Sequence, residues 1–187
     1  QFVTTSDVTI IPTEGVYTFT NIDVKEGTLL TIQYTKNSAD PTQRFLLNDR
    51  NIDTSTLKVK VQNSVADITQ TTYVEASDFL EVKSDSEVFF LDAVEDGFYE
   101  ISFGDEVLGK SIIDGNFVIV EYIVCNEDDA NGANSFTLQS SVGGSTNATI
   151  TTVINSENGA PRETIESIKF NAPKAYSAQK RAVTAED

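Results

Sequence analysis

The 187-residue sequence predicts a mainly β protein, an antiparallel sandwich or barrel, with a short α-helical segment near its C-terminus and so an α+β fold overall. Two observations predict the sheets. Apolar and polar residues alternate with a period of two, and turn dipeptides interrupt this alternation at short intervals. A third observation, apolar residues at helical spacing after residue 160, predicts the helix.

The expected strands each carry apolar residues on one face, and turns separate them. The alternating residues are Leu30, Ile32 and Tyr34, then Leu57, Val59 and Val61, then Tyr99, Ile101 and Phe103. Residues 117–124 are apolar on both faces, which is typical of a central strand. Turns are expected at Glu14-Gly15, Glu26-Gly27, Asp96-Gly97, Asp114-Gly115, Asn131-Gly132 and Gly143-Gly144. Short strands with such frequent turns indicate a sandwich or barrel.

The C-terminal segment has a different pattern. Pro161 is expected in the first turn of a helix, Ile165 and Ile168 follow at helical spacing, and Pro173 is expected to end it. Thr184, followed by acidic residues, resembles a helix N-cap. We therefore expect a β-rich N-terminal layer over residues 1–44, a sandwich-like domain over 45–155, and a helical connector over 156–187 that leads to a missing C-terminal part. The lack of Met also predicts a piece of a longer chain.

Composition excludes several kinds of chemistry. The chain has 13 Lys and Arg against 29 Asp and Glu, a net charge of −16, which disfavours binding to nucleic acid or anionic membranes. It has no His, which excludes Ser-His-Asp and Cys-His nucleophile systems and His-ligated metals. Cys125 is the single Cys, so it cannot form an internal disulfide or a thiolate metal cage, and we expect a buried, inert thiol.

Residues 104–111 match the phosphate-binding pattern G-x-x-x-x-G-K-[ST], but their surroundings argue against a nucleotide site. Such a loop opens a helix whose N-terminus holds phosphate. Here Ser111 is followed by Ile112, Ile113 and a turn, and Asp105 and Glu106 would bring negative charge to the phosphates. A glycine-turned β-hairpin is the preferred interpretation.

Acidic residues offer two further candidates, a calcium loop and a catalytic carboxylate pair. Glu127, Asp129 and Asn131 have calcium-loop spacing, but Leu138 stands where an EF-hand requires a bidentate Glu. A looser calcium site stays open. Carboxylate pairs such as Glu95-Asp96 are too abundant in this chain to indicate catalysis, and solvated acidic faces explain them. The sequence thus predicts no enzyme and no cofactor.

Two segments together resemble a known family. Residues 90–105 read FLDAVEDGFYEISFGD and continue through Gly109-Lys110 and residues 114–116 to Tyr122, while residues 166–176 and 179–187 read ESIKFNAPKAY and QKRAVTAED. They resemble the J-like baseplate wedge proteins of contractile-tailed bacteriophages, closest to the large wedge subunit of myoviruses. The resemblance covers about residues 45–187. It departs at Glu106, where many members have Gly, so that turn is expected to differ.

The resemblance implies a structural role without catalysis. Such wedge subunits associate with themselves and with other wedge proteins in the inner baseplate ring around the tail tube, which transmits the change of baseplate shape that releases sheath contraction. It implies a place in the virion, with assembly in the bacterial host cytoplasm. It implies no nucleic-acid, membrane or small-molecule partner.

A basic and aromatic segment is the candidate partner-binding strip, formed by Lys174, Tyr176, Lys180 and Arg181. In a strongly acidic chain, such a strip complements an acidic surface of a partner. The alternative is that Tyr176 only packs the connector against the body. An alternative function is an extracellular or virion β-sandwich that binds carbohydrate or calcium through its acidic loops.

Overall fold

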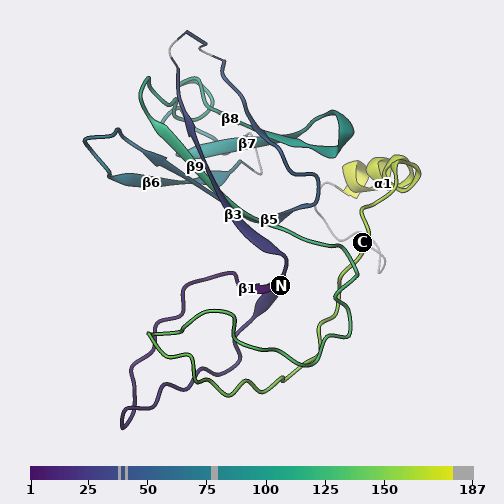
Figure 1. The fold of residues 1–187 in the computed structure, drawn as a ribbon. Helices are drawn as coiled ribbons and strands as arrows, with labels where there is room; N and C mark the ends of the chain where they lie inside the picture. Colours follow the sequence, from purple (N-terminus) through teal and green to yellow (C-terminus); the bar gives the residue numbers. More distant parts are fainter. Residues whose placement is uncertain (38, 41, 77–79, 179–187) are drawn as a thin grey trace. The chain divides into compact units, whose positions relative to one another are not determined.

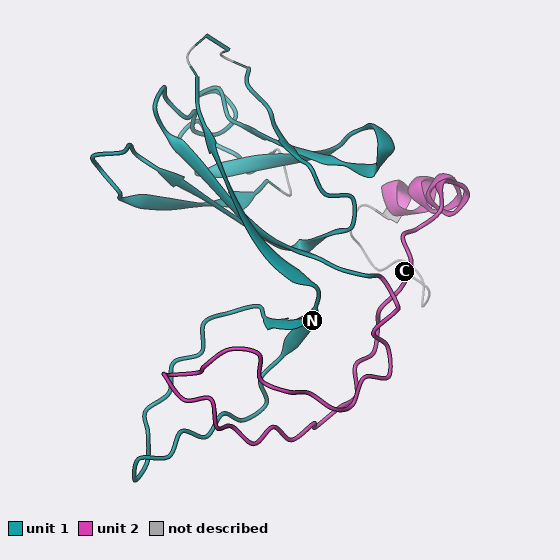
Figure 2. Ribbon diagram, viewed as in Figure 1, with its two compact units in different colours: residues 1–126 teal, residues 127–187 magenta. Residues whose placement is uncertain are grey.

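The computed structural model describes residues 1–37, 39–40, 42–76 and 80–178. The chain divides into two compact units, residues 1–126 and residues 127–187 (Figure 2). The strand β3 (Thr28–Thr35), which belongs to the expected 1–44 layer, lies in the main sheet of the first unit. That first unit therefore begins at residue 1 and ends within the expected central domain.

The first unit is built on a seven-stranded, nearly closed, barrel-like sheet with the order β3-β9-β5-β6-β7-β8-β4 (Figure 1). A two-stranded antiparallel sheet, β1-β2, precedes it, and the short 3-10 helix η1 connects β7 to β8. The prediction of a mainly β fold with one short C-terminal helix is confirmed. The elements are β1 (Phe2–Thr4), β2 (Val24–Glu26), β3 (Thr28–Thr35), β4 (Phe45–Leu47), β5 (Ile52–Gln62), β6 (Gln70–Glu75), β7 (Val88–Ala93), η1 (Glu95–Gly97), β8 (Tyr99–Phe103), β9 (Phe117–Val124) and α1 (Ile165–Ala178).

The strand β9 is central, as its apolar sequence predicts. It pairs with β3 along its whole length, from Thr28 opposite Val124 to Thr35 opposite Phe117, and with β5 on its other side. Its residues Val118, Val120, Tyr122 and Ile123 are fully or almost fully buried. The fully buried Tyr122 hydroxyl donates to Asp49 Oδ2 at 2.6 Å, which satisfies its polar atom inside the barrel.

The predicted alternation is confirmed in the other strands. In β5, Val59 and Val61 are buried while Lys58 and Lys60 are exposed, so one face of the strand enters the core. Ile101 in β8 is fully buried. The ring of Phe103 packs edge-on against the rings of Phe45 and Tyr73, at centroid distances of 5.9 Å and 5.3 Å respectively.

One pair of neighbouring strands departs from the antiparallel expectation. β6 and β7 are parallel and share only two residue pairs, Val74 with Val88 and Glu75 with Phe89. A parallel pair requires a crossover connection of about a dozen residues, and residues 76–87 supply that length. Alternation alone specifies which residues are buried but not the direction of the neighbouring strand.

The two edge strands of the sheet, β3 and β4, meet through side chains. Tyr34 of β3 donates its hydroxyl to the carbonyl oxygen of Leu46 in β4 at 2.6 Å. The ring of Tyr34 also lies 5.4 Å from that of Phe45, centroid to centroid. These contacts bring the sheet close to a closed barrel, and closure protects edge strands from pairing with other chains.

The predicted helix exists, but both of its expected ends are wrong. α1 begins at Ile165 rather than near Pro161, because Thr164 caps it: the Thr164 hydroxyl accepts from the Ser167 amide at 3.2 Å, and its carbonyl accepts from the Ile168 amide at 2.9 Å. The helix also continues through Pro173 to Ala178. Alanines and a lysine flank Pro173, and their helix propensity favours continuation. The cap expected at Thr184 lies outside the described residues.

Candidate functional site

The candidate strip begins within helix α1 itself. Lys174 and Tyr176 both belong to α1, whereas Lys180 and Arg181 lie outside the described residues. Residues two apart on a helix differ by about 200° in direction. Tyr176 therefore shares a face with Ile165 and Ile168, while Lys174 lies on the other side of the helix. The two predicted residues do not form one surface.

Sequence reasoning missed Phe170, which belongs with Lys174. The Lys174 ammonium lies 4.1 Å above the centroid of the Phe170 ring, a cation–π contact. Their spacing of four residues is the signal that could have identified the pair, because such residues are neighbours on a helix. This contact keeps the Lys174 charge on the face of α1 opposite Tyr176.

Helix α1 is exposed on all sides in the described residues. Phe170 is 67% exposed and Tyr176 is 84% exposed, and Ile165 and Ile168 are exposed as well. Between residues 165 and 177, only Ser167 is half-buried. A helix in a folded protein normally buries one apolar stripe, and α1 instead leaves its apolar residues exposed.

The start of α1 is organised by polar contacts. The carboxylate of Glu163 accepts from the Ser167 hydroxyl at 2.6 Å and from the Asn171 side-chain amide at 3.2 Å. These hydrogen bonds hold the pKa of Glu163 below its usual value. A carboxylate at a helix N-terminus also interacts favourably with the helix dipole. The geometry of the exposed helix is therefore specified locally, without a buried face.

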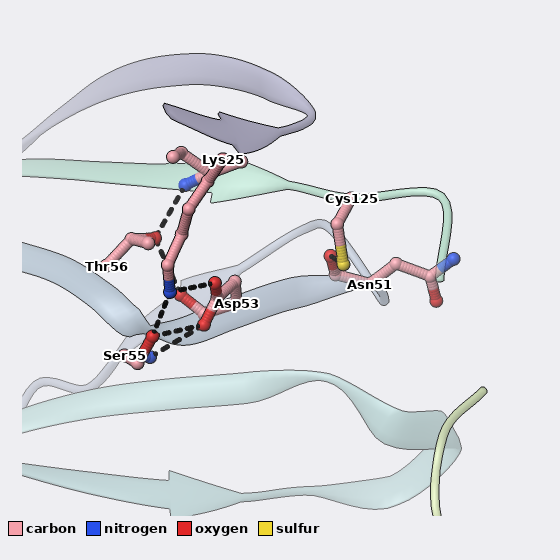
Figure 3. Close-up of polar contacts among 7 residues, drawn as sticks. Lys25, Asn51, Asp53, Ser55, Thr56 and Cys125 are labelled. Carbon is pink, nitrogen blue, oxygen red and sulfur yellow. Dashed lines mark hydrogen bonds and ion pairs between the residues drawn. The ribbon is translucent and has the colours of Figure 1, made fainter. Parts of the chain in front are cut away.

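The first unit contains a polar cluster at a bulge in β5 (Figure 3). The β5–β9 register shifts between Asp53 and Lys58, and the Thr56 hydroxyl fills the gap. It donates to the Asp53 carbonyl at 2.7 Å and accepts from the buried Ile123 amide at 3.0 Å. The Lys25 ammonium from β2 reaches Asp53 Oδ2 at 2.7 Å and the Ser55 hydroxyl at 2.6 Å. The cluster joins the β1-β2 sheet to the barrel.

The same cluster combines Lys, Ser and Asp, residue types that also occur in hydrolases, but its geometry is that of a clamp. Burial acts to raise the pKa of Asp53, yet hydrogen bonds from Lys25 and Ser55 outweigh it and hold that pKa below its usual value. The Lys25 ammonium donates to both neighbours, so it does not act as a base toward the Ser55 hydroxyl.

Cys125 lies at the end of β9 and is half-buried rather than fully buried. Its thiol donates to the carbonyl oxygen of Asn51 at 3.4 Å, and its amide donates to the same oxygen at 2.9 Å (Figure 3). Both contacts extend the β5–β9 pairing by one residue. The thiol therefore contributes a hydrogen bond at the end of the β5–β9 pairing.

The segment that matches the phosphate-binding pattern is a crossover loop. β8 and β9 are not neighbours in the sheet, so the expected hairpin is wrong. As expected, residues 112–116, directly after Ser111, form no helix. The Lys110 ammonium binds Glu87 at 2.8 Å. Asp105 Oδ1 accepts the amides of Val107 and Leu108, both at 3.0 Å. The lysine and the loop amides that would hold phosphate are engaged with carboxylates.

Glu106 lies in a turn expected to differ in shape because it carries Glu rather than Gly. Glu106 has a φ of +69°, the left-handed conformation that glycine adopts without steric cost. Its amide donates to the Gly109 carbonyl at 2.9 Å, and its carboxylate accepts from the Ser111 hydroxyl at 3.0 Å. The loop therefore keeps a conformation suited to Gly while bearing Glu.

In the candidate calcium loop, the side-chain amide of Asn131 is hydrogen-bonded to Gly159. Asn131 accepts the Gly159 amide through Oδ1 at 2.9 Å and donates through Nδ2 to the Gly159 carbonyl at 2.8 Å. These two bonds close the base of a loop in the second unit. In the part of the chain that the structure describes, no group of three or more acidic, Cys or His side chains is arranged to hold a metal ion.

A shallow hollow of about 260 Å³ lies over β7 and β8, and aromatic rings and one carboxylate are among the groups that line it. The carboxylate is Asp105, whose Oδ1 already accepts the two loop amides described above. The hollow is lined by Phe90, Phe103, Gly104, Asp105 and Leu108.

Among the described residues, no helix has the length and apolar character required to cross a bilayer. Comparison of the sequence with protein-family models and with curated proteins gave no match.

Proposed function

We propose that this chain is a structural subunit of a phage tail baseplate wedge. In this role it assembles with itself and with other wedge proteins around the tail tube, in the virion, after synthesis in the bacterial host cytoplasm. The proposal starts from the resemblance of residues 90–122 and 166–187 to wedge proteins. Those residues include β8 and most of β7, β9 and helix α1.

The exposed helix α1 is the observation that carries the proposal. Its apolar residues Ile165, Ile168 and Tyr176 share one face, and all three are exposed. Fully burying an aliphatic side chain of this size is worth about 1.5–3 kcal/mol, so a partner that covers this face gains substantial stability. The polar clusters of the first unit are engaged in holding strands and loops together, which favours a mechanical role over a chemical one.

The central test changes Tyr176 of α1 together with Lys180 and Arg181 of the candidate strip. The variant combines Tyr176→Ser with Lys180→Glu and Arg181→Glu. It is co-expressed with the wedge proteins encoded beside this chain, and complexes are separated by sedimentation. We expect the variant to bind at least about tenfold more weakly than the parent chain, since aromatic and Arg side chains dominate interface energies.

A matched control reverses two charges on the barrel instead, with Lys60→Glu and Lys83→Glu. Both lysines are exposed, so this variant carries the same added negative charge and is expected to co-assemble normally. Both variants are expected to unfold at the parent's denaturant midpoint, because Tyr176, Lys60 and Lys83 are all exposed. Normal co-assembly of the helix variant would contradict the proposal, as would a parent chain that never enters the complex.

A further inference from the structure

The second unit contains a long segment without charge. From Ala130 to Ser156 the sequence has no Asp, Glu, Lys or Arg, in a chain that is 22% charged. Within it, residues 148–154 read ATITTVI, which combines high β-propensity with no charge and no Pro. Such short segments pair readily with copies of themselves.

Within the uncharged segment, residues 133–156 have the geometry of a hairpin at both ends. At the turn, the Val142 amide donates to the Ser145 carbonyl at 2.9 Å, and the reverse bond is 3.0 Å. Gly143 and Gly144 have φ values of +58° and +83°, as a two-residue type I′ hairpin turn requires. At the open end, the Ser156 amide donates to the Ala133 carbonyl at 2.9 Å.

The two arms of the hairpin are the stretches before and after the Gly143-Gly144 turn. Between the turn and the open end, no ladder of backbone hydrogen bonds joins them. Residues 137–141 and 146–150, all described, form no backbone hydrogen bond with each other. Ile150 is 44% exposed and Val153 is 74% exposed. Backbone amides and carbonyls in a β-prone arm are a ready template for pairing with another strand.

We propose that residues 133–156 form a homotypic interface, in which the hairpin pairs edge to edge with the same hairpin of a second copy of this chain. Charge identifies the partner. The chain has a net charge of −16, so most of its surface repels a second copy, whereas this hairpin brings no like charges together. A basic partner would instead be attracted to the acidic surfaces. The proposal goes beyond the proposed function, because it uses a surface other than α1 and does not require the phage setting.

Sedimentation velocity over a range of protein concentrations tests this interface. The parent chain is expected to pass from monomer to dimer as concentration rises. In the double variant Ile150→Lys with Val153→Lys, pairing would bring the added positive charges of the two copies to the same paired edge, which is destabilising in a sheet. We expect dimerisation of this variant to be at least tenfold weaker.

The control variant is Val65→Lys with Ile68→Lys, in the turn between β5 and β6. Val65 is 80% exposed and Ile68 is 74% exposed, so this variant adds the same charge at apolar residues that are at least as exposed as Ile150 and Val153. It is expected to dimerise like the parent. Circular dichroism and thermal unfolding of all three proteins establish that a loss of dimer is not a loss of fold.

Three outcomes would overturn the homotypic interface: a parent chain that stays monomeric throughout, a hairpin variant that dimerises like the parent, or growth into ever larger species without a discrete dimer. The salt dependence separates this interface from α1. Pairing through an uncharged hairpin is expected to persist at high salt, whereas contacts through Lys180 and Arg181 weaken there. The helix variant is also expected to dimerise normally.

Discussion

Replacing Gly104 by alanine is expected to lower the free energy of unfolding by about 3 kcal/mol, the upper end of the range for overpacked sites. A Cβ at this position would lie 2.2 Å from the carbonyl carbon and oxygen of Gly109 and 2.4 Å from the Leu108 carbonyl oxygen. These are backbone atoms, so no side-chain rotation relieves the clash. The β8–β9 crossover loop must move instead. Urea unfolding followed by circular dichroism measures the loss.

Gly115→Ala is the matched control for Gly104→Ala. Gly115 has a φ of +81° and no atom within 4 Å of its added Cβ, so alanine there suffers only the left-handed backbone conformation. That cost is about 1 kcal/mol. Equal losses for the two variants would show that the crossover loop does not pack against Gly104 as described.

Leu47→Ala is expected to cost about 2–5 kcal/mol of unfolding free energy, by loss of buried apolar surface and creation of a cavity. Leu47 lies in β4, the short edge strand at the seam of the barrel, and it is 0% exposed. Because β4 has only three residues, it has few other contacts to hold it in the sheet. The denaturant midpoint should fall accordingly.

The neighbouring residue provides the control. Leu46 points away from the core and is 43% exposed, so Leu46→Ala is expected to change the free energy of unfolding by only about 0.5 kcal/mol. The difference in unfolding free energy between Leu47→Ala and Leu46→Ala then measures the contribution of burying the side chain, because the chemical change is the same. Comparable losses at both positions would mean that β4 does not place Leu47 in the core.

The sequence predicts the barrel strands well where burial is one-sided or complete. Val59 and Val61 lie in the core as alternation requires, and the doubly apolar run of β9 is central. The parallel β6–β7 pair and the Tyr34 contact to Leu46 were not predictable. Both depend on which strands become neighbours, and a period of two contains no information on neighbours.

The helix and its candidate strip were predicted only in part. Helical spacing identified Ile165 and Ile168 correctly, but Pro173 does not end the helix, because the helix propensity of the residues that flank it favours continuation. Basic and aromatic composition singled out Lys174 and Tyr176 without showing that they occupy opposite faces. Composition ignores direction around the helix, and Phe170 was missed for the same reason.

Two surfaces now carry the assembly account. Helix α1 exposes Ile165, Ile168 and Tyr176, the face proposed to bind a partner, and the uncharged hairpin over residues 133–156 is the segment proposed to pair with a second copy. Each has its own variant, its own control and its own salt dependence. The loss of one interface would therefore leave the other measurable.

Immunogold electron microscopy of the virions that encode this chain tests the wedge assignment most directly. Antibodies raised against the chain are applied to intact tails, and the position of the gold label is recorded. The account predicts label at the baseplate, in particles whose sheath is extended. Label that is absent from purified virions, or that lies along the sheath or on the capsid, would contradict it.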